Sequence, residues 1–277
     1  MNAITLEAFA KLNLGLRVRG VRPDGFHEIE SVFQTISLSD RLTIQKRDDP
    51  DIRVSIRPDA DIDPRDNLVT RAATYLQRRW KVSTGAEIRL EKRIPIGAGL
   101  GGGSSDAAAT LTGLNEAWDL NLGRADLHAL ALELGSDVPF FLRGGRCRVR
   151  GRGERIEPIN PHRSCDDDTF VLLMPPWSLS TAQVYRTFDQ LSASVLLNAP
   201  YPNDLEAAAI RLEPQLGDYR DWLESHELAF GLSGSGPVYF IVARTVEEAD
   251  HWADRARRNL PGDVVVCRPT ADGHRRA

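Results

Sequence analysis

The chain has 277 residues, of which 42% are hydrophobic and 27% are charged, as in an ordinary folded protein. That length predicts one large domain or two modest ones and argues against disorder. The formal net charge is −4 without a basic block or tail, and no uncharged apolar run approaches the ~20 residues that span a bilayer. Neither nucleic acid nor a membrane is therefore expected as a partner.

The cysteines and the start of the chain bear on localisation. Cys147, Cys165 and Cys267 are far apart, and no CxxC pair occurs. This spacing argues against a disulfide framework and against a structural zinc site. The first residues also lack the basic and then apolar layout of a signal peptide. A reducing cytoplasm is the expected location.

A strand is predicted over residues 4–18, where apolar residues alternate with others. Lys11 and Asn13 lie on the face opposite Leu12 in this pattern. Lys11 is one of only four lysines among 35 basic residues, and it sits inside an apolar segment. The rest of the first half predicts a turn at 22–25, strands within 27–46 separated by a turn near Ser39 and Asp40, and a strand at 52–57. A helix is predicted from a cap at Asp66 or Asn67 to about Trp80, with Tyr75 on its apolar face, and a strand follows at 86–94.

A glycine-rich loop follows, with a predicted helix over 106–118 after it. Five of the seven residues from 97 to 103 are glycine. Glycines let backbone N–H groups converge, and a helix N-terminus adds unpaired donors and partial positive charge. A flexible hinge is the alternative, but a hinge does not need two serines directly before a helix. The residues predicted to cradle phosphate are Pro95, Ile96, Gly97, Ala98, Gly99, Leu100, Gly101, Gly102, Gly103, Ser104 and Ser105.

The type of phosphate ligand is a separate question. Gly97, Gly99 and Gly102 match the G-x-G-x-x-G pattern of dinucleotide sites, which is weak alone. Such a site expects a strand ending in an acidic residue about 20 residues on, whereas Glu116 and Asp119 lie at the end of a predicted helix. No lysine follows a glycine, so the loop is not a Walker loop either. A dinucleotide oxidoreductase is therefore a distant alternative.

The remaining segments predict mixed helices and strands. Asp137 lies in a loop at 136–139 and, taken alone, is more often a turn or cap residue. A polar stretch at 158–168 suggests a boundary between domains of residues 1–157 and 158–277. Strands and helices do not alternate strictly, which favours an α+β fold. The elements expected here are a helix at 125–134, strands to about 157, a strand at 169–174, helices near 181–189, 203–212 and 215–226, a glycine-serine loop at 231–237, a strand at 238–243, a helix capped by Thr245 and Glu248, and a strand at 263–268.

Together, Lys11, the loop at 95–105, the segment around Asp137 and the loop at 231–236 resemble the GHMP kinases, a superfamily of galactose, homoserine, mevalonate and phosphomevalonate kinases. The resemblance runs from about residue 5 to at least 240. It implies a two-domain α+β fold with the active site in the interdomain cleft, and phosphoryl transfer from ATP with magnesium. Further segments that carry it are 10–14, 22–28, 66–68, 134–141, 151–154, 180–185 and 203–206.

The resemblance also implies roles for single residues. Lys11 and Asp137 match the family's catalytic pair, and the loop at 95–105 matches its ATP loop. The chemistry agrees, because an attacking alcohol must lose a proton and a carboxylate within reach can take it. Asp137 is the expected base. Lys11 is expected to keep Asp137 ionised and to stabilise the developing charge, which a compact ammonium does better than a planar guanidinium.

The substrate side is implied in the same way. The segments match best those members that phosphorylate the 2-hydroxyl of a cytidine diphosphate-linked methylerythritol, a small-molecule substrate. Phe26, His27 and Tyr185 match the cytidine pocket, where two rings offer stacking faces and the imidazole offers polar atoms. Asn13 is expected beside the substrate. A histidine at the side of a turn, with no ligand, is the alternative for His27.

Three points stay open at this stage. The magnesium ligands are unknown, because no carboxylate is dedicated to the metal; Ser104 or Ser105 and the ATP phosphates could hold it with waters. Asp106 is interpreted as a charge that complements the helix dipole. The oligomeric state is not indicated.

Two other functions compete with this one. Another small-molecule kinase of the superfamily would not need a pocket of Phe26, His27 and Tyr185 for a cytosine ring. A catalytically silent nucleotide-binding protein would not need both Lys11 and Asp137.

Overall fold

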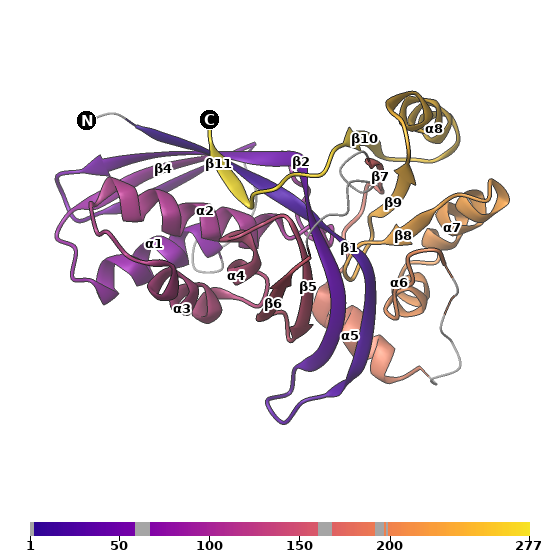
Figure 1. The fold of residues 1–277 in the computed structure, drawn as a ribbon, viewed down its shortest axis with the longest axis horizontal. Helices are drawn as coiled ribbons and strands as arrows, with labels where there is room; N and C mark the ends of the chain where they lie inside the picture. The colour runs from indigo at the N-terminus through magenta and orange to yellow at the C-terminus, as the bar shows by residue number, and fades with distance from the viewer. Residues whose placement is uncertain (1–2, 59–66, 160–167, 192–196, 198) are drawn as a thin grey trace.

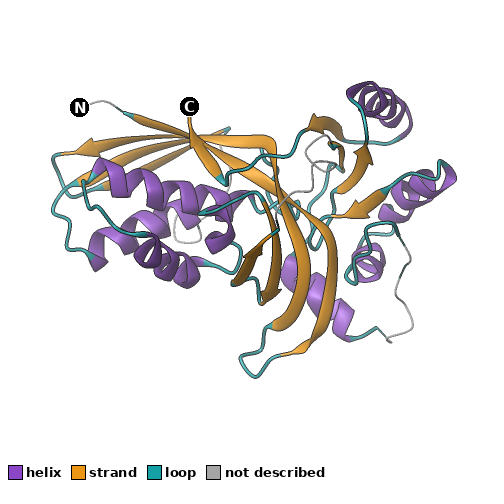
Figure 2. Ribbon diagram, viewed as in Figure 1, coloured by secondary structure: helices purple, strands orange, loops and turns teal. Residues whose placement is uncertain are grey.

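The computed structural model describes residues 3–58, 67–159, 168–191, 197 and 199–277. Asp66, Cys165 and most of the expected domain boundary lie outside these residues. Within the described part the chain forms two β-sheets, one of seven strands and one of four, and helices pack against both (Figures 1 and 2).

The larger sheet has the strand order β11-β1-β2-β4-β3, with β5 paired to β2 and β6 paired to β5. Its pairs are antiparallel except for β3 with β4. The strands are β1 (Ile4–Val21), β2 (His27–Arg47), β3 (Ile52–Arg57), β4 (Gly85–Glu91), β5 (Arg146–Gly151), β6 (Arg155–Pro158) and β11 (His274–Arg276).

Strand β2 runs unbroken for 21 residues, so the predicted turn near Ser39 and Asp40 is wrong. The register against β1 shifts between Phe9 and Ala10 instead, and such a bulge bends a strand without ending it. The Asp40 side chain is buried and accepts hydrogen bonds from the backbone N–H groups of residues 93–94 at 2.5 and 2.9 Å. Asp40 is a residue type common in turns, but here it binds a distant loop and does not form a local turn.

Four helices pack together on one face of the larger sheet (Figure 1). Their buried leucine, alanine and phenylalanine side chains share one apolar core with the sheet. Asn67 caps the first helix by accepting from the backbone of Val69 at 2.8 Å, as predicted. Tyr75 is 37% exposed, so its predicted place on the apolar face is wrong. The helices are α1 (Leu68–Arg79), α2 (Gly102–Ala117), α3 (Arg124–Leu134) and α4 (Val138–Phe141).

The smaller sheet has the order β10-β7-β9-β8 and forms a second core with the helices of its half. Helix α5 coincides with its predicted range. The three-residue strands β8 and β11 were not predicted. The elements of this half are β7 (Thr169–Met174), α5 (Thr181–Asp189), α6 (Glu206–Leu212), α7 (Leu216–Ser225), β8 (Phe230–Leu232), β9 (Tyr239–Ala243), α8 (Val246–Asn259) and β10 (Asp263–Cys267).

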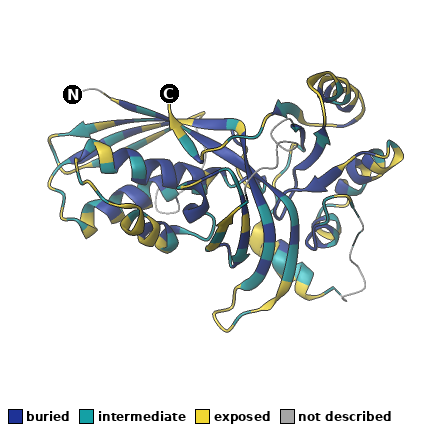
Figure 3. Cartoon of the chain, viewed as in Figure 1, coloured by how far each residue is buried: buried dark blue, intermediate teal, exposed yellow. Residues whose placement is uncertain are grey.

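The two sheets meet across a third apolar cluster, which includes Leu12, Phe170 and Phe240. Consequently the middle of β1 is buried on both faces, with Leu12 at 0% and Lys11 at 3% exposure (Figure 3). Strand β11 pairs with β1, so the end of the chain returns to the larger sheet. The division into domains at residues 157 and 158 stays a proposal.

Candidate active site

A cleft of about 940 Å³ opens between the two halves of the molecule. The β1–β2 hairpin, the glycine-rich loop, the segment before α4 and helix α5 all contribute to its wall. Of the site residues expected from the sequence, only Ser105 does not line it. Those that do are Lys11, Asn13, Phe26, His27, Pro95, Ile96, Gly97, Ala98, Gly99, Leu100, Gly101, Gly102, Gly103, Ser104, Asp137 and Tyr185.

Three glycines of the loop adopt a left-handed backbone conformation. Gly97, Gly99 and Gly101 have φ of 69°, 74° and 71°, a region that side chains disfavour. Helix α2 then begins at Gly102, four residues before the predicted start, so its first turn carries the serines. The N–H groups of a first helical turn have no partner within the helix, which suits them to an anion.

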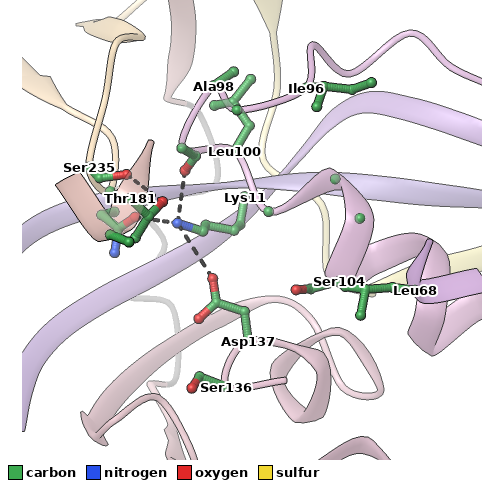
Figure 4. A pocket seen from close by; sticks show the side chains of 18 of the residues that line it. Lys11, Leu68, Ile96, Ala98, Leu100, Ser104, Ser136, Asp137, Thr181 and Ser235 are labelled. Atoms are coloured by element: carbon green, nitrogen blue, oxygen red, sulfur yellow. Dashed lines mark hydrogen bonds and ion pairs between the residues drawn. The ribbon is translucent and has the colours of Figure 1, made fainter. Parts of the chain in front are cut away.

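The two serines behind the loop differ. Ser104 lines the cleft (Figure 4). Ser105 is fully buried in α2, and its hydroxyl has no hydrogen-bond partner in the described structure. The expectation that Ser105 contributes its side chain to the ATP loop is therefore not supported by its position, because the helix turns it away from the cleft.

The second glycine-serine loop holds the first in place. Ser233 Oγ donates to the carbonyl of Gly99 at 3.2 Å and accepts from the backbone N–H of Asn13 at 3.3 Å. Asn203 donates from its side chain to the carbonyls of Leu232 and Gly234 at 2.8 and 2.7 Å. A segment far along the chain thus fixes the geometry of the phosphate loop.

Lys11 lies between the glycine loop and Asp137 (Figure 4). Its ammonium donates to the Gly99 carbonyl at 2.9 Å and to the Asn13 side chain, and stands 3.9 Å from Asp137 Oδ2. Burial lowers the Lys11 pKa below its usual value, and the charge of Asp137 partly opposes this. The lysine is therefore a desolvated cation aimed at the centre of the cleft.

Asp137 stands at the N-cap position of α4, but its side chain makes no capping hydrogen bond. The alternative that Asp137 is there to cap a helix therefore finds no support in the geometry. Its side chain is 28% exposed, so it is open to the cleft while paired with Lys11. Such a carboxylate can accept a proton from a bound alcohol.

The proposed cytidine residues line the same cleft. The rings of His27 and Tyr185 stand 4.6 Å apart between centroids with a tilt of 32°. Phe26 is half-exposed, and the Arg152 guanidinium lies 5.0 Å from its ring centre. His27 Nε2 is 2.7 Å from Asp189 Oδ1. The sequence interpretation missed both Arg152 and Asp189; a carboxylate at the end of a predicted helix was the available signal for Asp189.

Asp106 is a buried residue behind the loop, so its interpretation as a charge that simply complements the helix dipole is incomplete. Lys92 donates to Asp40 at 2.5 Å and to Asp106 at 2.9 Å. Burial raises the pKa of Asp106 to about 8, against the opposing charge of Lys92. This cluster ties the first turns of α2 to β2. The position of Lys92, a rare lysine directly before the glycine loop, was the signal for it.

Two family models match the chain. The model described as GHMP kinases N terminal domain matches residues 67–145, and GHMP kinases C terminal matches residues 185–262. A 4-diphosphocytidyl-2-C-methyl-D-erythritol kinase of Pelotomaculum thermopropionicum is 42% identical, over 92% of this chain and 94% of its own. The kinase of the same name from Aliivibrio salmonicida is 38% identical, over 95% of this chain and 91% of its own.

Solved structures agree with these matches. A crystal structure of 4-(cytidine 5'-diphospho)-2C-methyl-D-erythritol kinase has a TM-score of 0.78 and 33% identity, covering 96% of this chain and 99% of its own. A homoserine kinase of Cytophaga hutchinsonii has a TM-score of 0.77 at 17% identity, covering 100% of this chain and 98% of its own, and so shows the fold alone. The chain belongs to the GHMP kinase family.

It is a small-molecule kinase with that family's mixed α+β fold, and membership implies ATP as the phosphoryl donor. Among the described helices none is long and apolar enough to cross a membrane. Cys147 and Cys267 are free and buried.

Proposed function

We propose that this kinase transfers the γ-phosphoryl group of ATP to the 2-hydroxyl of 4-diphosphocytidyl-2-C-methyl-D-erythritol, a cytidine diphosphate compound of the non-mevalonate isoprenoid pathway, in the cytoplasm. The observation that carries this proposal is that one cleft brings three groups of residues together. The glycine loop, the pair of Lys11 and Asp137, and the rings of His27 and Tyr185 all line this cleft.

In this reaction Asp137 is the base. Its carboxylate accepts the proton of the substrate hydroxyl as the oxygen attacks phosphorus. Lys11, whose ammonium lies 3.9 Å from that carboxylate, stabilises the negative charge on the transferring group. Phosphoryl transfer asks mainly for such positioning and charge neutralisation. Asn13 accepts from the Lys11 ammonium and donates to Ser31 at 3.0 Å, which fixes the direction of the lysine side chain.

In this proposal the glycine loop holds the ATP phosphates with its backbone N–H groups. Gly97, Gly99 and Gly101 leave no room for a side chain, because an added Cβ atom would meet other protein atoms at 2.9 Å or closer. The described residues contain no group of three or more His, Cys, Asp or Glu side chains that could hold a metal. Ser104 and Asp137 offer oxygen atoms in the cleft, which suits magnesium held mainly by phosphates and waters. When bound, the metal neutralises phosphate charge.

The alkaline side of the pH profile is expected to report Lys11. Because burial lowers the pKa of Lys11, kcat/KM should fall as the pH rises through a midpoint below 10.5, the usual value for a lysine. In Lys11→Arg the guanidinium stays charged, so residual activity should lose this alkaline limb. An identical limb in both proteins would contradict the assignment. The measurement is kcat/KM from about pH 6 to about pH 10.

Replacing His27 with alanine is expected to weaken binding of the cytidine substrate by about tenfold or more, because a polar partner and a ring face are lost. Turnover at saturation and the KM for ATP should change little, since Lys11 and Asp137 are untouched. Steady-state kinetics measure both, after KM has been shown to approximate Kd. An unchanged KM for the cytidine substrate would reject this pocket.

The identity of the product tests the proposal directly. The 2-carbon of the substrate bears a methyl group and no hydrogen, so a phosphate ester on its oxygen has no three-bond coupling to a proton. Phosphorus NMR of the product should show a new phosphomonoester resonance without such coupling, beside the intact diphosphate. A coupled resonance would place the phosphate on another hydroxyl and refute the 2-hydroxyl as acceptor.

A further inference from the structure

Helix α5 surrounds the His27 ring with three side chains. Tyr185, Phe188 and Asp189 are spaced so that they share one face of the helix. Tyr185 packs over the ring at 4.6 Å, Phe188 meets it edge-on at 6.4 Å, and Asp189 Oδ1 lies 2.7 Å from Nε2. The orientation of an imidazole from β2 is thus set by the other half of the molecule.

Asp189 is unfavourably placed for its own helix. It is the last residue of α5, where the helix macrodipole disfavours negative charge. Its carboxylate contacts His27, which lies 162 positions away in the sequence. Both residues line the cleft. The contact therefore accounts for a carboxylate at this position, whereas the helix does not.

Resting on the proposed function, we propose that Asp189 is a positioning residue that makes the site select cytosine over uracil. Its carboxylate can only accept a hydrogen bond, so it holds the proton of His27 on Nε2. In the neutral imidazole the other ring nitrogen, Nδ1, is then an acceptor. No described residue hydrogen-bonds to Nδ1, which leaves it for a ligand.

The chemistry of the two bases decides the selectivity. Cytosine carries an amino group at the position where uracil carries a carbonyl oxygen. An acceptor at Nδ1 binds the amino group and faces the lone pairs of the carbonyl unfavourably. A site built to hydrogen-bond one group discriminates strongly against a ligand that lacks it. Without Asp189 the proton can move to Nδ1, and the ring then donates to uracil instead.

The test compares binding of cytidine 5'-diphosphate and uridine 5'-diphosphate by calorimetry. The intact protein should bind the cytidine compound at least about tenfold more tightly. In Asp189→Ala that ratio should fall by about tenfold, chiefly through weaker cytidine binding. Asp189→Asn keeps an acceptor oxygen and should retain most of the preference. Asp221→Ala, which removes an exposed carboxylate from α7, should leave the ratio unchanged.

A spectroscopic readout separates positioning from a general structural effect. In ¹⁵N-histidine spectra the intact protein should show His27 protonated at Nε2 alone, and Asp189→Ala should show protonation at Nδ1 as well. The ATP affinity should stay unchanged in both proteins. An unchanged base preference in Asp189→Ala would overturn this inference alone, as would a proton on Nδ1 in the intact protein. If the intact protein does not bind cytidine 5'-diphosphate, that result would contradict both this inference and the proposed function.

Discussion

Replacing Asp137 with asparagine is expected to lower kcat by about 10²–10⁴-fold, the usual effect of losing an acid-base group. The amide has nearly the same shape but cannot take the proton of the attacking hydroxyl. It also leaves Lys11 without the carboxylate 3.9 Å away, so the lysine loses an interaction that favours its charged form. Binding of ATP and of the substrate should be largely retained, because the glycine loop and His27 do not depend on Asp137.

The measurement combines turnover with calorimetric binding of both ligands. Asp126→Asn is a matched control, since it changes an exposed carboxylate in the first turn of α3 and should retain full turnover. Loss of turnover with intact binding would identify a chemical role. Near-normal turnover in Asp137→Asn would remove Asp137 as the base.

The second large effect is expected at Gly99, where alanine should raise the KM for ATP more than about tenfold and lower the free energy of unfolding by about 1–3 kcal/mol. Gly99 has φ of 74°, and an added Cβ would stand 2.2 Å from the backbone oxygen of Ser233. The added Cβ is fixed to the backbone and meets a backbone oxygen, so no flexible side chain can move away to relieve this contact. The two loops must therefore separate, which disturbs the Gly99 carbonyl that binds Lys11.

Gly20→Ala is the control that separates backbone strain at positive φ from the steric clash expected at Gly99. Gly20 has φ of 140°, yet a Cβ added there would have no atom within 4 Å, so this variant should show backbone strain alone. Urea denaturation and the KM for ATP measure the two quantities for each variant. Equal effects of the two substitutions would show that the contact between the loops does not matter for ATP binding.

Local patterns were sufficient for much of the fold. Alternation predicted β1, and α5 coincides with the helix predicted near residues 181–189. The break expected in β2 was wrong because Asp40 looks like a turn residue, while its hydrogen bonds reach residues 93–94. The three-residue strands β8 and β11 exist only through their pairing partners, which no local pattern contains.

The residues of the site also fall into those that the sequence reveals and those that only the folded structure reveals. The glycine loop and the lysine inside an apolar strand are visible in the sequence, because each breaks its local pattern. The contact of His27 with Asp189 and that of Lys92 with Asp106 join separate elements. The sequence marks Asp189 and Lys92 as unusual, but no spacing rule identifies the residues that they contact. Ser105 is the reverse case. It adjoins the loop in sequence, but α2 starts early and its helical turn buries the side chain.

The central claim is most directly tested by release of ADP from magnesium-ATP with 4-diphosphocytidyl-2-C-methyl-D-erythritol, run beside mevalonate, phosphomevalonate, homoserine and galactose. We expect turnover with the cytidine compound alone, because only that substrate carries a base that can bind at His27 and Tyr185. Turnover with one of the other alcohols instead would contradict the cytidine assignment. Tight ATP binding without turnover on any of them would contradict the catalytic roles of Lys11 and Asp137.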